Sequence, residues 1–527
     1  MIQLKHDSKK PLYQQIYEQL REEILSGNVE VGAKLSPIRA LANDLEVSRN
    51  TVETAYMQLS LEGYVSSRVG SGFIVEKIEL PPESKDNKTR ESAEDFLRRL
   101  SKTSIWKHCD YDKFEQNTAM STATDTATDT ATDTATDTAT DTAVGTAMSG
   151  KKSALTSSKA ILYDFTYGNL PNGSFPSQIW RKLTTNILLS CEAIKASRYT
   201  DPLGEHGLRE HIAHYLHLHS GVNCHPAQVV IQPGTQACLY NLLLLFDPLR
   251  DVIAMEEPGY DGVRLVFENA RFKLYPIPVM EPASEYMNAY YSSNARLAYV
   301  TPSNQFPTGK ILHLPQRQAL LRWATNNNAY IIEDDYCREY RYTMRPLPSL
   351  QSLDRDNRVI YMGTFSKALS PALRINYLVL PPDLLFEWHK IYANHYPEVP
   401  WLSQAILEAY MRDGHWEKRL RRAQSANKRK YDLLKSSIKK HMGEKVDIME
   451  NGSGLHLLLG TRDGRHQNEL IAKALESGVK VYGTSRYCMS QRHALKSYVL
   501  VGFSVIDEKH IAAGVKALAE AWFGSEQ

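Results

Sequence analysis

A lysine with the surroundings of a Schiff-base nucleophile stands at position 367. It follows an apolar run that is typical of a strand, and a lysine at a strand end can be desolvated, which lowers its pKa and leaves the amine nucleophilic. Thr364 and Ser366 precede the lysine and Arg374 follows it. Hydroxyl and guanidinium groups are suited to holding a phosphate. A solvated loop can have the same composition, so this motif predicts a phosphate-bearing cofactor only together with others.

Carboxylates and a phenol follow a second apolar run, 330–332. Asp334 and Tyr336 thereby stand at the carboxyl end of a predicted strand, which is where α/β sheets build their sites. An aspartate there can hold a pyridine nitrogen protonated, and a phenol can bond to an oxygen on the ring. A solvated acidic turn is the alternative interpretation, and the lysine motif makes it the weaker one.

Two more motifs fall in the order that such a site needs. Residues 229–236 predict a strand, a glycine turn and the start of a helix. The free amides of a helix start, here with Gly234, Thr235 and Gln236, suit a phosphate. Tyr260 follows another apolar run and offers a face for stacking on a ring. Each motif is weak alone, but the ordered set of four predicts a pyridoxal 5′-phosphate site in an α/β domain.

The first 77 residues have the pattern of a DNA-binding module. Helices are predicted over 12–26, over 38–45 and from Ser48 onward, and strands over 64–67 and 73–75 across a glycine-rich turn. Three helices followed by a hairpin are the layout of a winged helix-turn-helix. A small helical interaction domain is the alternative, which the hairpin disfavours.

Short donors are predicted on the outward face of the third helix, and they suit phosphates and base edges. These residues are Ser48, Arg49, Asn50, Thr51 and Thr54. Arg39 and Arg68 lie where the second helix and the wing would meet the DNA backbone. Residues 1–77 hold nine Lys/Arg and ten Asp/Glu. The prediction of DNA binding therefore depends on where the donors lie and not on total charge.

The chain has 527 residues with a net charge of +2, so bulk charge identifies no partner, and its length predicts several domains. Its six cysteines are scattered without a Cys-x-x-Cys pair, which argues against a zinc ribbon and a disulfide framework and favours a reducing compartment. No signal peptide is recognisable, and the purest apolar run, 242–246, is too short to cross a bilayer. We therefore expect a cytoplasmic protein without membrane contact.

Composition divides the chain into three parts. Residues 1–77 form the predicted winged helix-turn-helix, and residues 161–527 alternate strand-like and helical stretches. Between them, residues 78–160 carry Thr-Ala-Thr-Asp repeats whose aspartates recur every four positions. Such a repeat could be a helix, but it holds nothing that could anchor a core, so we expect an acidic, flexible linker. A short amphipathic stretch at 91–102 either docks on a neighbour or is a transient helix.

The N-terminal motifs resemble the GntR winged-helix domain. The similar segments cover nearly all of residues 1–77 and include 12–16, 47–52, 62–64 and 70–72. At 35–39 the sequence departs from the family, which usually has proline directly after the leucine. The resemblance implies binding to a double-stranded DNA operator.

From about Phe165 onward the chain resembles the class I aminotransferases of fold-type I, including the segments 199–204, 207–209 and 301–309. The resemblance implies a large mixed sheet with helices on both faces and a small C-terminal lobe. It implies that Lys367 forms the internal aldimine and that Asp334 pairs with the pyridinium. Tyr336 would bond to the ring hydroxyl, and Tyr260 would stack on the ring. The phosphate would be held by Gly234, Thr235, Gln236, Thr364, Ser366 and Arg374, with Tyr199 reaching the partner subunit's phosphate.

Two departures weaken the prediction of efficient transamination. Phe306 stands where aminotransferases usually have an asparagine, and residues 499–501 lack the arginine that grips a substrate carboxylate. A GntR head, a linker and an aminotransferase-like body with these departures resemble the MocR/GabR regulators. That resemblance implies a head-to-tail homodimer that binds pyridoxal 5′-phosphate and DNA. It also implies that an amino acid or amine effector is sensed by forming an external aldimine.

Two alternatives stay open: a working aminotransferase with an accessory DNA-binding head, and a repressor whose body is a cofactor-free dimerisation scaffold. For a carboxylate on the effector, the sequence offers Arg486, after a strand-like run and a glycine turn, and Arg264 as a second candidate. A guanidinium can hold a carboxylate through two parallel hydrogen bonds. A surface arginine in a loop is the alternative interpretation of Arg486, which the resemblance disfavours.

Overall fold

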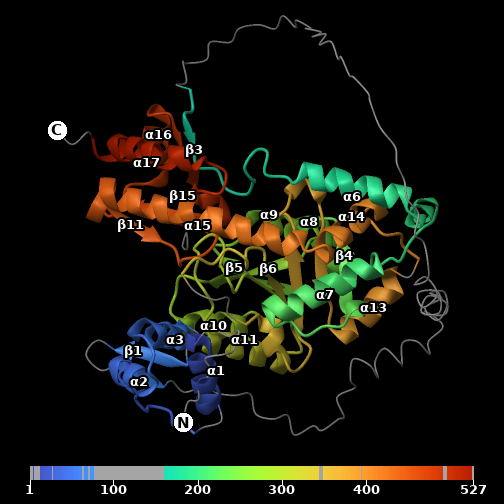
Figure 1. The fold of residues 1–527 in the computed structure, drawn as a ribbon, viewed down its shortest axis with the longest axis horizontal. Coiled ribbons are helices and arrows are strands. Elements are labelled where there is room, and N and C mark those ends of the chain that lie inside the picture. The colour runs from blue at the N-terminus through green and yellow to red at the C-terminus, as the bar shows by residue number, and fades with distance from the viewer. Residues whose placement is uncertain are drawn as a thin grey trace, which may run out of the picture.

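The computed structural model describes the N-terminal ranges 4, 12–25, 28–61, 64–68 and 72–75 and the C-terminal ranges 160–343, 348–392, 394–490 and 495–524. Figure 1 shows these parts in colour. The Thr-Ala-Thr-Asp repeats and the stretch 91–102 lie outside the described residues. In the part of the chain that is described, no helix is both long and apolar enough to cross a membrane.

The N-terminal unit has the predicted three helices and hairpin. These are α1 (Leu12–Leu25), α2 (Ile38–Asp44), α3 (Arg49–Leu61), β1 (Val65–Arg68) and β2 (Gly72–Val75). The strands pair antiparallel. Apolar residues spaced three or four apart place one face of each helix inwards. The resulting core contains Ile16, Leu20, Ile24, Val52, Ala55, Tyr56 and Leu59, all buried.

The large lobe is built on a seven-stranded mixed sheet in the order β4-β10-β9-β8-β7-β5-β6. Its strands are β4 (Val229–Gln232), β5 (Val252–Glu257), β6 (Lys273–Pro278), β7 (Leu297–Val300), β8 (Tyr330–Asp334), β9 (Val359–Thr364) and β10 (Asn376–Val379). Only β10 runs antiparallel to its neighbours. Most of these strands are buried on both faces, which is why their sequences are continuous apolar runs and do not alternate.

Helices cover both faces of this sheet (Figure 1). One face packs on α8 (Thr235–Leu243), α9 (Asp261–Asn269) and α13 (Pro382–Tyr392). The other packs on α10 (Ala283–Ser292), α11 (Leu314–Asn326) and α12 (Leu350–Leu353). The remaining large-lobe helices are α6 (Ser177–Leu189), α7 (His206–Ser220) and α14 (Trp401–Arg412). The expected α/β class with a large mixed sheet is confirmed.

A smaller lobe follows the long helix α15 (His415–Met442). Its four-stranded sheet has the order β11-β12-β15-β14. The elements are β11 (Val446–Met449), β12 (His456–Thr461), β14 (Tyr482–Gly483), β15 (Tyr498–Gly502), α16 (Gln467–Glu476) and α17 (Glu508–Phe523), with β13 (Val479–Lys480) paired to β3 (Tyr163–Asp164).

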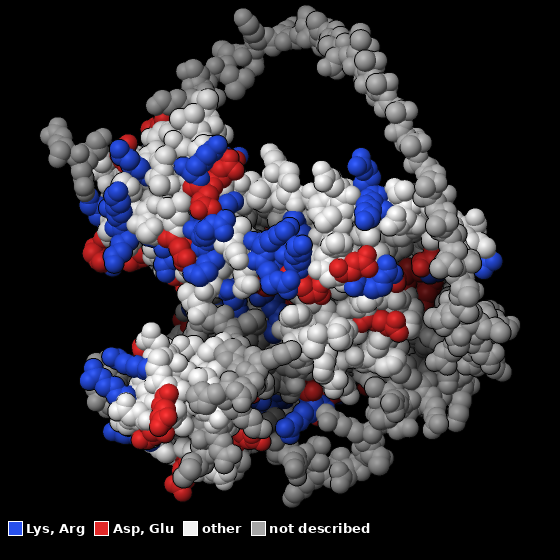
Figure 2. Space-filling view, viewed as in Figure 1, with Lys and Arg blue, Asp and Glu red and all other residues white. Residues whose placement is uncertain are grey.

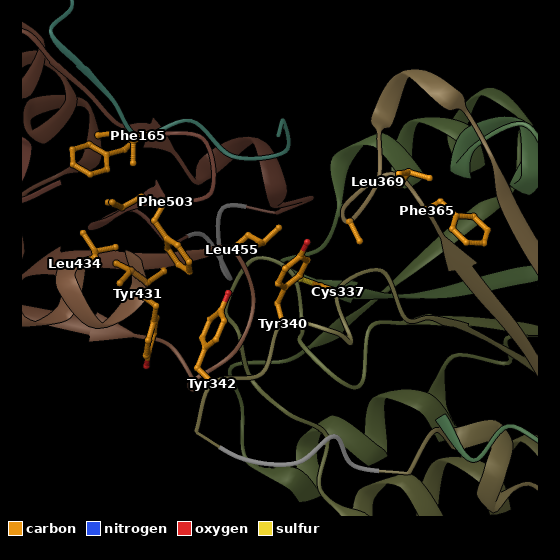
Figure 3. Close-up of a cluster of buried hydrophobic side chains, with 14 of the residues drawn as sticks. Phe165, Cys337, Tyr340, Tyr342, Phe365, Leu369, Tyr431, Leu434, Leu455 and Phe503 are labelled. Atoms are coloured by element: carbon orange, nitrogen blue, oxygen red, sulfur yellow. The ribbon is translucent and has the colours of Figure 1, made fainter. Parts of the chain in front are cut away.

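Aromatic packing joins the small lobe to the segment that follows β8. Figure 3 shows Phe503 of the small lobe and Tyr431 of α15 beside Tyr342. The rings of Tyr342 and Tyr431 are stacked with centroids 5.0 Å apart. Asp334 and Tyr336 lie a few residues before Tyr342 in the chain. The stacking of Tyr342 on Tyr431 therefore positions the small lobe relative to the predicted site.

Candidate functional site

Lys367 lies in the turn that follows β9, with its amine enclosed by other residues. The Nζ atom donates to the carbonyl oxygen of Gly168 at 3.3 Å and lies 4.6 Å from the centre of the Tyr167 ring. Burial lowers the pKa of Lys367, although Cys337 and Asp334 act in the opposite direction. A larger neutral fraction follows, and the neutral form is the nucleophile.

At the end of β8, three consecutive carboxylates point to alternate faces of the sheet, as successive side chains of a strand do. Glu333 accepts the backbone N–H groups of Leu350 and Gln351, and Asp335 forms an ion pair with Arg338 at 3.1 Å. Only the middle carboxylate, Asp334, is on the opposite face of the strand, close enough to Lys367 to raise its pKa.

Asp334 is poised to meet a positive charge. It is buried and accepts a hydrogen bond of 2.5 Å from the hydroxyl of Tyr299. Burial raises the pKa of Asp334 to about 7, because no full ion pair compensates the loss of water. A protonated ring nitrogen would supply that missing charge.

A cradle for an anion lies between the start of α8 and the segment before β10. Gly234 precedes α8 with φ of +83°, and any side chain there would collide with the guanidinium of Arg374. Within the described residues, that guanidinium forms no hydrogen bond or ion pair. A guanidinium without a partner among the described residues, beside the first amides of a helix, is a site that suits a phosphate.

The hydroxyls of the cradle are tied together by a residue that the sequence analysis missed. The side-chain amide of Asn376 lies 2.8 Å from the Thr364 hydroxyl and 3.0 Å from that of Thr235. Thr364 also accepts the backbone N–H of Ser366. The side chain of Gln236 turns away and donates to the carbonyl of Gly262, which leaves only its backbone amide for an anion.

In the segment 301–309, Phe306 stands where aminotransferases usually have an asparagine, and the amide of another residue, Asn304, reaches Tyr336. Phe306 is buried and packs edge-on against Tyr260 and Tyr336 as an apolar wall. The amide comes from Asn304, two residues earlier, whose Nδ2 donates to the Tyr336 hydroxyl at 2.9 Å. Asn304 stood inside the recognised motif, but only the fold shows that its side chain reaches Tyr336.

The wall beside Phe306 includes a histidine that the sequence did not single out. His456, at the start of β12, is buried against Phe306 and Tyr167. Burial lowers the pKa of His456 to about 4, so the imidazole is neutral at physiological pH. Its Nε2 lies 2.9 Å from the carbonyl oxygen of Pro307.

The two candidate arginines for an effector carboxylate are neighbours. Arg486 forms an ion pair with Asp261, in which Nε donates to Oδ2 at 2.7 Å, and its side chain is 66% exposed. Arg264 donates to the backbone carbonyl of Arg486 at 2.9 Å and lies 3.7 Å from Glu268. A carboxylate bound by Arg486 would have to compete with Asp261.

Tyr199 is an exposed aromatic residue. It stacks on Tyr396 with centroids 3.9 Å apart, and both rings are largely exposed. Leu188, Leu189 and Ile194 are further exposed apolar side chains on α6 and the turn after it. Among the described residues of one chain, the side chain of Tyr199 forms no hydrogen bond, so nothing of that kind connects it to Lys367.

The N-terminal unit presents the expected residues at the start of α3. Ser48 accepts the backbone N–H of Thr51 and so caps the helix, and the Thr54 hydroxyl donates to the carbonyl of Asn50. Arg49 is more than half exposed, with Glu53 at 4.0 Å. Arg39, on α2, is exposed as well. The Arg68 side chain lies outside the described residues.

Comparison with known proteins matches both units. Residues 12–75 match the bacterial regulatory proteins of the gntR family, and residues 163–499 match aminotransferase class I and II. The chain is 35% identical over 512 residues to the uncharacterized HTH-type transcriptional regulator YdeL of Bacillus subtilis, covering 97% of each. It is 31% identical over 529 residues to the probable rhizopine catabolism regulatory protein MocR of Rhizobium meliloti, covering 97% of that protein. The chain belongs to the MocR family of transcriptional regulators.

The body of this MocR-family regulator has the fold of an aminotransferase. A crystal structure of Pyrococcus horikoshii kynurenine aminotransferase matches 69% of the chain and 91% of that protein, with a TM-score of 0.62 and 24% identity. The predicted resemblances of both units are therefore confirmed, and the protein is an HTH-type transcriptional regulator with an aminotransferase-like domain. Among the described residues, no cluster of His, Cys, Asp or Glu could hold a metal ion.

Proposed function

We propose that this MocR-family regulator binds pyridoxal 5′-phosphate in its body and senses an amino-group effector there. The observations that support the proposal are that Asp334, 33 residues before Lys367, is close enough to interact with its amine, and that Arg374 lies against Gly234, 140 residues earlier in the chain. The cofactor would supply an aldehyde that condenses with amines and a ring that withdraws electrons.

The residues present fit this group in charge and shape. Asp334, a buried carboxylate that forms no ion pair with a described residue, suits the ring nitrogen. The guanidinium of Arg374, which has no hydrogen-bond or ion-pair partner among the described residues, suits the phosphate. Thr235, Thr364 and Ser366 would add donors around the phosphate. Tyr260 would cover the ring, and Tyr336 with Asn304 would face the ring oxygen.

The effector would be sensed because its amine competes with the Lys367 amine for the same position on the cofactor. Lys367 would hold the cofactor until an effector amine takes the place of its Nζ atom. Release of that atom would free the turn after β9. Arg486 or Arg264 would then orient a carboxylate on the effector.

The site favours sensing over repeated turnover. Phe306 replaces an amide donor by an apolar wall, and the buried strand β15 carries Val499, Leu500 and Val501 without an arginine. An aminotransferase needs a firm grip on both amino and keto acids, and this site lacks the usual one. We therefore rank an active aminotransferase as the second function.

We also propose that the protein works as a head-to-tail homodimer. Tyr199, Tyr396 and the exposed leucines of α6 are apolar side chains that a second copy could cover. Two copies would carry two GntR units, as recognition of a two-part operator requires.

Three measurements on the purified full chain test this function. A visible absorption band should be present, and borohydride reduction followed by peptide mass analysis should fix the cofactor on Lys367. Amino acids incubated with a keto acid should give no more than a few products per cofactor. Reduction onto another lysine, or the absence of a band, would overturn the cofactor assignment, and many turnovers would make the protein an enzyme.

A further inference from the structure

The helix α15 concentrates positive charge that the rest of the chain lacks. Its 28 residues include ten Lys/Arg and two Asp/Glu, a net charge of +8. The whole chain has a net charge of +2, so everything outside α15 sums to −6. Figure 2 shows blue side chains gathered where α15 crosses the centre of Figure 1.

The exposed cations of α15 fall on one face. They are three or four residues apart or a whole number of turns apart, which places them in a single stripe. This basic stripe consists of Lys418, Arg421, Arg422, Lys428, Arg429, Lys439 and Lys440, all exposed. The opposite face is anchored in the core by Trp416, Tyr431 and Leu434. At about 1.5 Å per residue the helix is about 42 Å long, so the stripe is a rigid, extended surface.

Most of the stripe is not neutralised by the protein. Lys428 pairs with Asp432 at 2.7 Å and Arg429 with Glu508 at 3.2 Å. The other five cations form no ion pair with any described residue. A line of unpaired cations along one helix is the electrostatic footprint of a nucleic-acid-binding surface.

The GntR unit does not supply such a footprint. Residues 1–77 carry nine Lys/Arg and ten Asp/Glu. The unit that is predicted to contact the base edges therefore has no excess of positive charge. Affinity for DNA comes largely from cations that displace counterions from the phosphates. We propose that the basic stripe of α15 binds the phosphate backbone of duplex DNA, as a second contact surface beside the GntR unit.

The same helix reaches the predicted cofactor site. Arg419, beside the stripe, donates to the carbonyl oxygens of Ala368 at 2.7 Å and Ser174 at 2.5 Å. Ala368 directly follows Lys367. DNA bound to α15 and a ligand bound at Lys367 would therefore both act on this one rigid helix. The two binding events are physically linked through it.

The test uses the full chain and a random-sequence duplex of about 60 base pairs, whose backbone contacts give a salt-dependent affinity. The stripe variant Arg421→Gln/Arg422→Gln/Lys439→Gln/Lys440→Gln is compared with a control that removes two arginines and two lysines elsewhere on the surface, Arg271→Gln/Lys273→Gln/Arg355→Gln/Lys496→Gln. All eight side chains are exposed. Circular dichroism and the visible band show that each variant is folded.

We expect the stripe variant to bind about tenfold more weakly, with the slope of log affinity against log salt reduced by about 0.9 for each phosphate that the variant no longer neutralises. The control should bind within about twofold of the wild type, because its cations lie outside the surface. Equal affinity and slope for the stripe variant and the wild type would overturn the proposal. Tighter binding of single-stranded RNA through the same residues would also overturn it.

A competing occupant is the chain's own acidic repeat. Deletion of residues 122–142 removes five aspartates and no basic residue. DNA affinity should stay unchanged in this deletion if the stripe is free for DNA. A gain that disappears in the stripe variant would show that the repeats occupy the stripe and would overturn the proposal. Arg49→Ala distinguishes the role of α15 from that of the GntR unit. This variant should change the preference for DNA sequence and leave unchanged the contribution of α15 to the slope of log affinity against log salt.

Discussion

Asn304 and Tyr336 form a reciprocal pair of hydrogen bonds: the Asn304 amide donates to the Tyr336 hydroxyl, which donates in turn to the backbone carbonyl of Asn304, both at 2.9 Å. Ser453 of the small lobe donates to the same amide at 3.1 Å. The pair thus connects the loop after β7, the end of β8 and the small lobe. It supplies the amide that Phe306 cannot.

Asn304→Ala should raise the pH at which the visible band of the bound cofactor changes. Tyr336 has one O–H, which it would turn from the Asn304 carbonyl to the ring oxygen. A hydroxyl that also receives a hydrogen bond is a stronger donor, so loss of the Asn304 amide leaves more negative charge on the ring oxygen to hold a nearby proton. A pH titration of the spectrum measures the shift. In the double variant with Tyr336→Phe, the two effects should not add. Additive shifts would show that the amide acts independently of Tyr336.

Asp334→Asn should stabilise the cofactor-free protein and weaken cofactor binding. Burial raises the folded-state pKa of Asp334 to about 7, above its ordinary value, so ionisation of this group costs stability as pH rises. That cost is absent below the unfolded pKa and complete above about pH 7. The variant should gain about 1–3 kcal/mol at pH 8 and less at pH 5. Thermal melts at the two values measure it, and a pH-independent difference would contradict it.

Arg49→Ala should weaken binding to the selected operator by about 1–3 kcal/mol if the guanidinium contacts a base edge. Its exposure at the first turn of α3 motivates the prediction. Lys34→Ala is the control, since that exposed cation of the same unit is not among the predicted DNA contacts. A footprint identical to that of the wild type at the same salt would remove Arg49 from the interface.

Arg486→Ala should keep the visible band and lose the spectral response to amino acids that carry a free carboxylate. Asp261→Asn should have the opposite effect, because it frees Arg486 from the ion pair that competes with an incoming carboxylate. Titrating both variants with a panel of amino acids tests the prediction. If Arg486→Ala responds like the wild type, Arg264 becomes the candidate, or the effector has no carboxylate.

Local patterns in the sequence were enough to predict much of this protein. The winged helix-turn-helix was predictable because an apolar repeat, a helix cap at Ser48 and a glycine-rich turn are all short-range signals. The lysine, aspartate and glycine motifs were recognisable for the same reason: each follows a strand whose apolar run is itself visible. The common edge of a parallel sheet predicts that they meet in one site.

Tertiary structure decided which side chains of those motifs face the site. The pleat of β8 selects Asp334 over its two acidic neighbours, and a partner on another strand, Asn376, ties Thr364 to Thr235. The fold likewise brings Arg486 into an ion pair with Asp261, which is 225 residues earlier in the chain. The charge of α15 was visible in the sequence, but only packing shows that its basic side chains share the exposed face. Such relationships arise from contacts between distant segments, and a local pattern carries no information about them.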